Sequence, residues 1–216
     1  MESGKLFNKL MGELKRSGIL MVVDPVLPSV ATIVAREPIR GSWWAHPKSH
    51  DIFAMNVRLS DHPDVLVTKL VAGKTTFVHR KIWLPLIQVA SAREPWQMNG
   101  LSDTARKLLS EVIRCGQARI DHLVPAWKID SKAIINAAKE LESRLLVHSD
   151  QVHTEKGAHS KELESWQHWV DRVELTIKPV PADDAKRNLE RILERLSPGS
   201  ALLPWMKKTP AKPRGR

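Results

Sequence analysis

The second half of the chain contains two amphipathic helices, separated by a short segment and followed by an alternating stretch of β-forming residues. Ser102 is a good N-cap for the first helix, whose apolar residues recur every three or four positions until Gly116. Asp130 or Ser131 begins the second helix, which continues to Leu145. Polar and apolar residues then alternate around a glycine turn, which predicts a β-hairpin. This order of elements restricts the fold more than any other feature of the sequence.

Two helices with a short segment between them and a hairpin after them are the chain order of a winged helix-turn-helix. We therefore predict an α+β protein whose C-terminal half is a winged helix. This domain covers residues 97–200 and includes a further amphipathic helix over 181–196, where leucine and isoleucine recur at helical spacing. We expect the chain over 161–170 to be helical as well.

The second helix has a polar side, which points away from its apolar face. The residues on this side are Lys132, Asn136, Lys139 and Ser143. Lysine and asparagine can contact phosphates and adenine edges in a major groove. Glu140 and Glu142 on the same helix favour the alternative, in which the polar side is simply solvated.

Residues 1–96 form a smaller N-terminal α/β part. Apolar spacing predicts a helix over 4–18 that ends at Gly18, a short strand in ILMVVDP, and a helix that begins at Asp51 and is ended by the turn at Asp61-His62-Pro63. We expect 26–42 to be a strand or an irregular connection. The polar stretch SAREPWQMNG then separates this part from the winged helix, and we expect residues 201–216 to form a disordered basic tail.

The clearest hairpin pattern of the chain is DVLVTKLVAGKTTFVHRKIW, in which two β-rich runs flank Ala72 and Gly73. Alternation predicts which side chains share a face of the first strand. One face carries Val65, Val67, Lys69 and Val71, and the other carries Leu66, Thr68 and Leu70.

The formal charge of +10 and a pI near 9.9 are typical of proteins that bind nucleic acid. Residues 1–96 carry 13 Lys and Arg against 8 Asp and Glu, whereas 97–205 carry 16 of each. The tail 206–216 adds five cations and no acid, and it could bind any polyanion without specificity. The surplus within the folded part therefore belongs to the N-terminal half.

Cations and indoles are interleaved in the N-terminal half. The candidate residues for nucleic-acid binding are Arg36, Arg40, Trp43, Trp44, His46, Lys48 and His50, with Arg80 from the hairpin. Such mixtures suit single-stranded or flipped nucleotides, because the cations hold phosphates while the rings stack on bases. An extended backbone would place one of the two adjacent indoles in the core and the other outward. The alternative is that both indoles merely pack.

Metal, cofactor and membrane sites are not expected. His46 and His50 have a spacing that could hold zinc, but Pro47 opposes a regular helix presenting both. The later histidines 148, 153 and 159 lack a neighbouring cysteine. The chain has no glycine-rich phosphate loop and no apolar run long enough for a membrane helix. The single Cys115 and the absence of a secretory pattern predict a cytoplasmic protein.

Four phrases carry a family resemblance: EPIRGSWWAHP, GKTTFVHRKIW, REPWQMNGLS and LESRLLVHSDQVHTEKGAHSKELESW. They resemble a bacterial family related to the alkylpurine DNA glycosylase AlkZ, over most of residues 15–170. The resemblance implies tandem winged helices and a connection to DNA repair. Enzymes of the AlkZ type use a Gln-x-Gln or Gln-x-Asp motif, and no glutamine of this chain stands in such a motif. We therefore carry over no catalytic residue.

These observations predict a DNA-binding protein of glycosylase-like ancestry. The cations Arg36, Arg40, Lys48 and Arg80 would contact phosphate, one of the two indoles would stack on a base, and His46 or His50 would bond a phosphate or a base edge. Two alternatives remain open. One is a glycosylase with a relocated acid, such as Glu37 or Asp51, and the other is a non-catalytic module that binds a protein partner.

Overall fold

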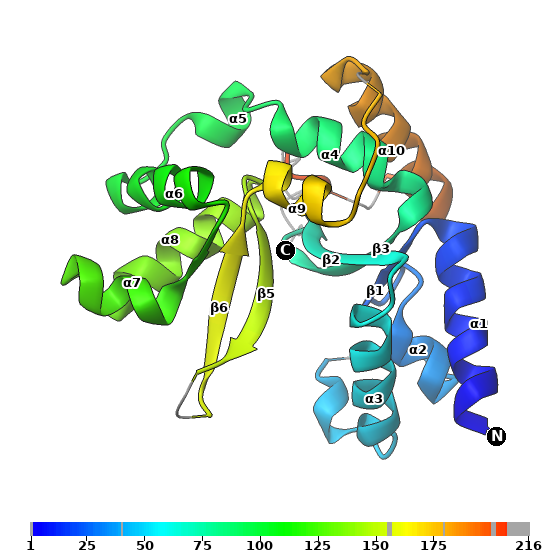
Figure 1. Ribbon diagram of the computed structural model, residues 1–216. Coiled ribbons are helices and arrows are strands. Elements are labelled where there is room, and N and C mark those ends of the chain that lie inside the picture. Colours follow the sequence, from blue (N-terminus) through cyan, green and yellow to red (C-terminus); the bar gives the residue numbers. More distant parts are fainter. Residues whose placement is uncertain (1, 40, 155–156, 179, 200–201, 207–216) are drawn as a thin grey trace, which may run out of the picture.

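The computed structural model describes residues 2–39, 41–154, 157–178, 180–199 and 202–206. The candidate Arg40 and the end of the basic tail lie outside the described residues. The protein is a mixed α+β protein with two three-stranded antiparallel sheets (Figure 1). Within the described residues, no helix combines the length and the apolar character needed to cross a membrane.

The first sheet and the three helices beside it form the first unit, residues 2–79. Its elements in chain order are α1 (Glu2–Ser17), β1 (Ile19–Met21), α2 (Val30–Ala35), α3 (Ser49–Ser60), β2 (Val65–Val71) and β3 (Lys74–His79). The sheet has the order β1-β3-β2, so the last strand lies in the middle. A short 3₁₀ turn, η1 (Trp43–Ala45), precedes α3.

The helix α2 was not expected, and the prediction of a strand or irregular connection over 26–42 is wrong for its residues. VATIVA is rich in β-branched residues, which favour strands when judged locally. Tertiary burial of Val30 and Val34 outweighs this preference, and the side chain of Ser29 caps the helix by accepting a hydrogen bond from the backbone N–H of Thr32.

The predicted hairpin is confirmed as β2 and β3. Val65 and Val67 face α1, α2 and α3, whereas Leu66 and Leu70 face the opposite side of the sheet. Val71 was predicted on the first face, yet it packs in the same core as Leu70. The strand register shifts between Thr68 and Val71, and this irregularity interrupts the alternation.

The second unit, residues 103–164, repeats the element order of the first. Its elements are α6 (Asp103–Cys115), β4 (Gln117–Arg119), α7 (Ile120–Trp127), α8 (Ser131–Ser143), β5 (His148–His153) and β6 (His159–Glu164). The sheet has the order β4-β6-β5, again with the last strand in the middle. Both units therefore have one topology, although the sequence shows no evident repeat.

The predicted caps of the second unit are confirmed. Ser102 and Asp130 accept hydrogen bonds from the backbone N–H groups of Ala105 and Ala133. The prediction of helix over 161–170 is wrong at its start, because residues up to Glu164 pair in β6.

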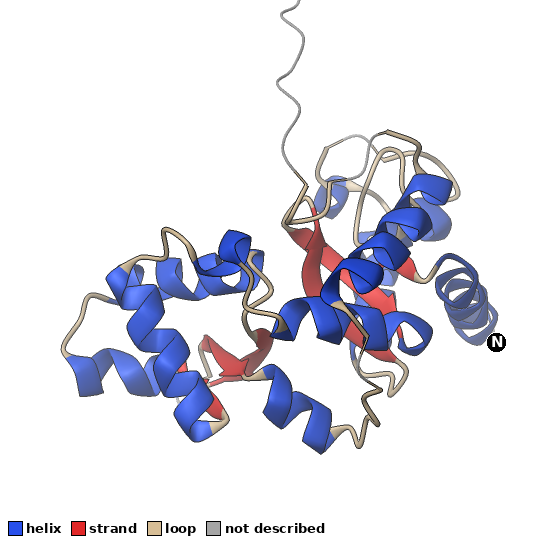
Figure 2. Cartoon of the chain, turned by 90° about the horizontal axis from the view of Figure 1, so that it is seen from above, coloured by secondary structure: helices blue, strands red, loops and turns tan. Residues whose placement is uncertain are grey.

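Further helices lie outside the two units, between them or after them in the chain. They are α4 (Trp83–Ser91), α5 (Pro95–Met98), α9 (Trp166–Arg172) and α10 (Ala182–Leu196), with the 3₁₀ turn η2 (Arg80–Ile82) before α4. One core lies within each unit, and a third core joins one face of the first sheet to α4, α9 and α10. Seen from above, the two sheets are separate, and helices lie over the first sheet (Figure 2).

Candidate nucleic-acid interface

The two adjacent tryptophans differ in exposure. Trp43 is 8% exposed and packs in the core of the first unit, whereas Trp44 is 63% exposed. Their rings stack with centroids 4.0 Å apart and planes inclined by 24°. One ring inward and one outward is what the sequence predicted, although the backbone forms the 3₁₀ turn η1 instead of an extended strand. The buried ring supports the exposed one from below.

Exposed apolar side chains of α3 lie beside the indole of Trp44. The ring of Phe53 lies 6.0 Å from that of Trp44, and Val57 follows one turn later. All three side chains are exposed by more than 40%, and we call them the α3 ridge. Neighbouring exposed apolar side chains form an apolar patch, and such patches occur at interaction surfaces. His50 is exposed one turn before Phe53.

His46 and Lys48 are held by bonds within the first unit. The Nδ1 atom of His46 accepts the backbone N–H of Lys48 at 3.1 Å, and Nε2 lies 3.1 Å from Oε1 of Glu37. The ammonium of Lys48 donates to the carbonyl oxygens of Val34 and Ala35 at 3.3 and 3.4 Å. These carbonyls end α2, so Lys48 satisfies groups that the helix leaves unpaired. Over the described part of the chain, no three His, Cys, Asp or Glu side chains are arranged to hold a metal ion.

Arg36 lines a cavity between α1, α2 and α3 with a volume of about 650 Å³, which we call the α1–α3 pocket. Its other charged lining residues are Lys5, Lys9, Lys48 and Asp51. Sequence reasoning missed Lys5 and Lys9, although their spacing of four residues places both on one side of the predicted first helix.

The α1–α3 pocket and the α3 ridge lie on different sides of α3. Asp51 lines the pocket, and Phe53 belongs to the ridge. Two residues correspond to about 200° of rotation around a helix. The predicted basic and aromatic residues therefore do not form a single surface.

Arg80 lies apart from both. Its guanidinium is 3.7 Å from Oδ1 of Asp64 and 5.6 Å from the ring centre of Trp83. Asp64 follows the C-terminal end of α3, whereas the tryptophan pair and the pocket lie at its N-terminal end. A helix of this length spans about 18 Å. We therefore do not assign Arg80 to the interface.

The third helix of the second unit, α8, holds the place that α3 holds in the first. Its exposed residues include Lys132, Asn136 and Lys139. Its two acids are engaged internally: Glu140 bonds Ser102 and Arg144, and Glu142 is 5% exposed. Lys161 donates to the carboxylate of Glu142 at 2.5 and 2.6 Å. The outer side of α8 thus presents cations and an amide, as the sequence predicted, together with the exposed Ile135. The internal bonds of the two acids are visible only in the structure.

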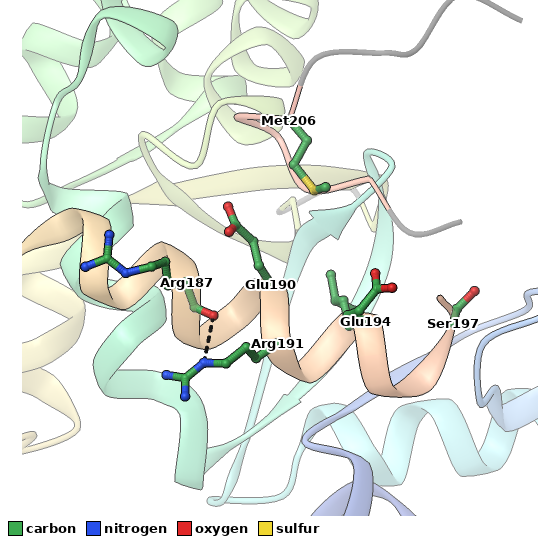
Figure 3. Close-up of a pocket in the computed structure, with 7 residues that line it drawn as sticks. Arg187, Glu190, Arg191, Glu194, Ser197 and Met206 are labelled. Atoms are coloured by element: carbon green, nitrogen blue, oxygen red, sulfur yellow. Dashed lines mark hydrogen bonds between the residues drawn. The ribbon is translucent and has the colours of Figure 1, made fainter. Parts of the chain in front are cut away.

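A second cavity lies along α10 (Figure 3). Its lining residues are Arg187, Glu190, Arg191, Leu193, Glu194, Ser197 and Met206. Two arginines are balanced there by two glutamates, and Glu190 also accepts a hydrogen bond from the indole of Trp205 at 2.7 Å. The described residues that line this cavity carry no net charge, in contrast to those of the α1–α3 pocket.

Comparisons of the chain with protein-family models, curated proteins and solved structures return no match. Function is therefore inferred from the topology and from the contacts of the residues described above.

Proposed function

We propose that this protein binds duplex DNA through two winged-helix units, residues 2–79 and 103–164. The repeated topology carries the proposal: each unit has the order helix, strand, helix, helix, strand, strand, with its last strand in the middle of the sheet. In a winged helix the third helix enters the major groove, and the β-hairpin that follows this helix is the wing. By this assignment α3 and α8 are the two recognition helices.

The contact by α8 is polar. Lys132 and Lys139 neutralise phosphates, and Asn136 reaches a base edge, for which adenine is the best partner. The internal bonds of Glu140 and Glu142 support this role, because they draw two carboxylates away from the surface that meets the DNA.

The contact by α3 is aromatic. Trp44 stacks on a base or wedges between base steps, with Trp43 holding its ring from below. His50 bonds a phosphate or a base edge beside it. A role in DNA repair agrees with this proposal, because enzymes that act on bases need side chains that fill the space of an extruded nucleotide.

Fluorescence anisotropy with a labelled duplex tests the proposal. Replacement of Lys132 and Lys139 by Ala is expected to weaken binding by about tenfold at low salt and to reduce the salt slope by about 2. Trp44→Ala is expected to weaken binding by about tenfold or more, and Trp44→Phe by less, because stacking contributes about 1–3 kcal/mol per base.

The matched control is Lys15→Ala combined with Lys178→Ala, which removes the same charge from exposed positions outside the proposed contacts. If the location of the charges matters more than their number, this double variant should bind the duplex with an affinity within about twofold of that of the natural chain. A chain that ends at residue 206 separates the folded part from the basic tail. The proposal is wrong if that shortened chain binds no duplex at low salt.

A further inference from the structure

The α1–α3 pocket combines an apolar floor with a cationic rim. Val34 and Met55 on the floor are each 3% exposed, and Leu6 and Ile33 adjoin them. The rim receives cations from all three helices or their ends: Lys5, Lys9, Arg36 and Lys48. The volume of about 650 Å³ lies within the range of sites for small molecules, which is about 300–1,000 Å³.

The rim of the α1–α3 pocket carries more positive than negative side chains. Asp51 is the one carboxylate among the described residues that line the pocket. Some exposed arginines elsewhere form ion pairs, such as Arg16 with Glu13 and Arg114 with Glu111. Within the described ranges, Lys5, Lys9 and Arg36 have neither an ion pair nor a side-chain hydrogen bond. Like charges gathered without partners repel one another, so a bound anion would relieve the repulsion.

Two of these cations are positioned by backbone geometry. Arg36 has a φ of 66°, a left-handed conformation that glycine or asparagine usually occupies at the end of a helix. Its backbone N–H donates to the carbonyl oxygen of Thr32, which fixes the residue beyond the last turn of α2. Lys48 uses two of its three N–H groups on carbonyl oxygens, so one donor remains for a ligand. This cap fixes where the side chain of Arg36 begins at the rim of the pocket.

We propose that the α1–α3 pocket binds a phosphate monoester, with the dianionic phosphate against the rim and the organic group against the apolar floor. Arginine and lysine are the usual partners of phosphate, and a monoester carries close to two negative charges at neutral pH. Such a group occurs in two places: on a free small molecule, such as a nucleoside monophosphate, and at the 5′ end of a DNA strand. The site does not depend on the DNA contacts proposed for α8.

Calorimetric titrations with inorganic phosphate and with phenyl phosphate test the site at constant ionic strength. Phenyl phosphate should bind several times more tightly than inorganic phosphate, because its ring covers the apolar floor. Arg36→Gly should weaken binding by about tenfold while leaving the thermal midpoint of unfolding unchanged or higher, since glycine relieves the left-handed backbone. Asp51→Asn should tighten binding several-fold, because it removes the negative charge beside the ligand.

The combined variant Lys15→Ala and Lys178→Ala is the control for total charge and should bind as the natural chain does. The proposal is overturned if phenyl phosphate shows no saturable binding at about 10 mM, or if Arg36→Gly and the control bind equally well. A second arm compares duplexes that end in a 5′ phosphate or a 5′ hydroxyl. A preference for the phosphate that Arg36→Gly abolishes assigns the site to DNA ends, and equal binding of both duplexes assigns it to a free ester.

The outcome for the pocket is separable from that for the DNA interface. Replacement of Lys132 and Lys139 by Ala should abolish most duplex binding and leave the titration with phenyl phosphate unchanged. Failure of the pocket would leave that duplex result intact.

Discussion

The ion pair between Arg119 and Asp121 shows how one residue ties a strand to a helix in the second unit. Nη2 and Nε of Arg119 lie 2.9 and 3.2 Å from the two oxygens of Asp121, and Nη2 also donates to the carbonyl oxygen of His153 at 3.2 Å. The pair therefore connects the start of α7 with the end of β5. The sequence shows both residues, but only the fold brings His153 to them.

This contact predicts a dependence of stability on pH. The hydrogen bonds from Arg119, opposed by partial burial, lower the pKa of Asp121 from 3.8 to about 2. A carboxyl group with a lowered pKa stabilises the fold above its unfolded pKa, and this contribution is lost as the pH falls through the folded value. Asp121→Asn should therefore lower the melting temperature at pH 5–7, and its difference from the natural chain should shrink below about pH 4. A difference that stays constant down to pH 2 in calorimetric scans would contradict the assignment.

At the scale of elements, Gly116 joins α6 to the following strand and to α9. The sequence predicts that this glycine ends the helix, and its φ of 80° agrees. The tertiary structure adds a second constraint: a Cβ atom at this position would lie 2.7 Å from Cδ2 of His168. The imidazole cannot move away freely, because its Nδ1 lies 2.6 Å from a carboxylate oxygen of the buried Glu164.

Gly116→Ala should therefore destabilise the protein more than the backbone conformation alone requires. We expect a loss of about 2–4 kcal/mol in the free energy of unfolding, measured in urea. Gly157 is the matched control, because its φ is 76° and a Cβ atom there would meet nothing within 4 Å. Gly157→Ala should cost only about 1 kcal/mol. Equal losses for the two variants would show that the contact with His168 is unimportant.

At the scale of the whole molecule, the two units share a hydrophobic core with the connecting helices. Leu66 and Leu70 of the first unit pack in the same cluster as Leu145, Trp166 and Trp169. The indole N–H of Trp166 donates to the carbonyl oxygen of Leu145 at 2.7 Å, where α8 leads into β5. The units are therefore joined by buried apolar contacts and not only by a flexible linker.

Shared burial predicts that both units unfold together. Urea titrations followed by NMR signals from β3 and from β6 should give one common transition. Trp166→Ala should move both sets of signals to lower urea, with a loss of about 3–5 kcal/mol, because it removes a large buried ring. Loss of the β6 signals in a separate, earlier transition would show that the units are independent.

Local sequence patterns were sufficient to predict those elements that depend on interactions between residues close together in the chain. The helix caps at Ser102 and Asp130 and the hairpin around Gly73 follow from hydrogen-bonding capacity and backbone freedom, and these are confirmed. The mixed α+β class follows from the same patterns. The surplus of positive charge in the N-terminal half is likewise a property of the sequence.

Only the tertiary structure decided that residues 30–35 form the helix α2. It also decided that the α1–α3 pocket and the α3 ridge are separate surfaces. Burial of valines outweighed their local preference for strands. The helical rotation between Asp51 and Phe53 assigned neighbouring residues to different surfaces. The residue patterns did not show the repeated topology, because strand order is set by long-range pairing that leaves no local mark in the sequence. In the stretch around Trp43 and Trp44, the buried ring of Trp43 supports the exposed ring of Trp44, and Lys48 lines the α1–α3 pocket instead.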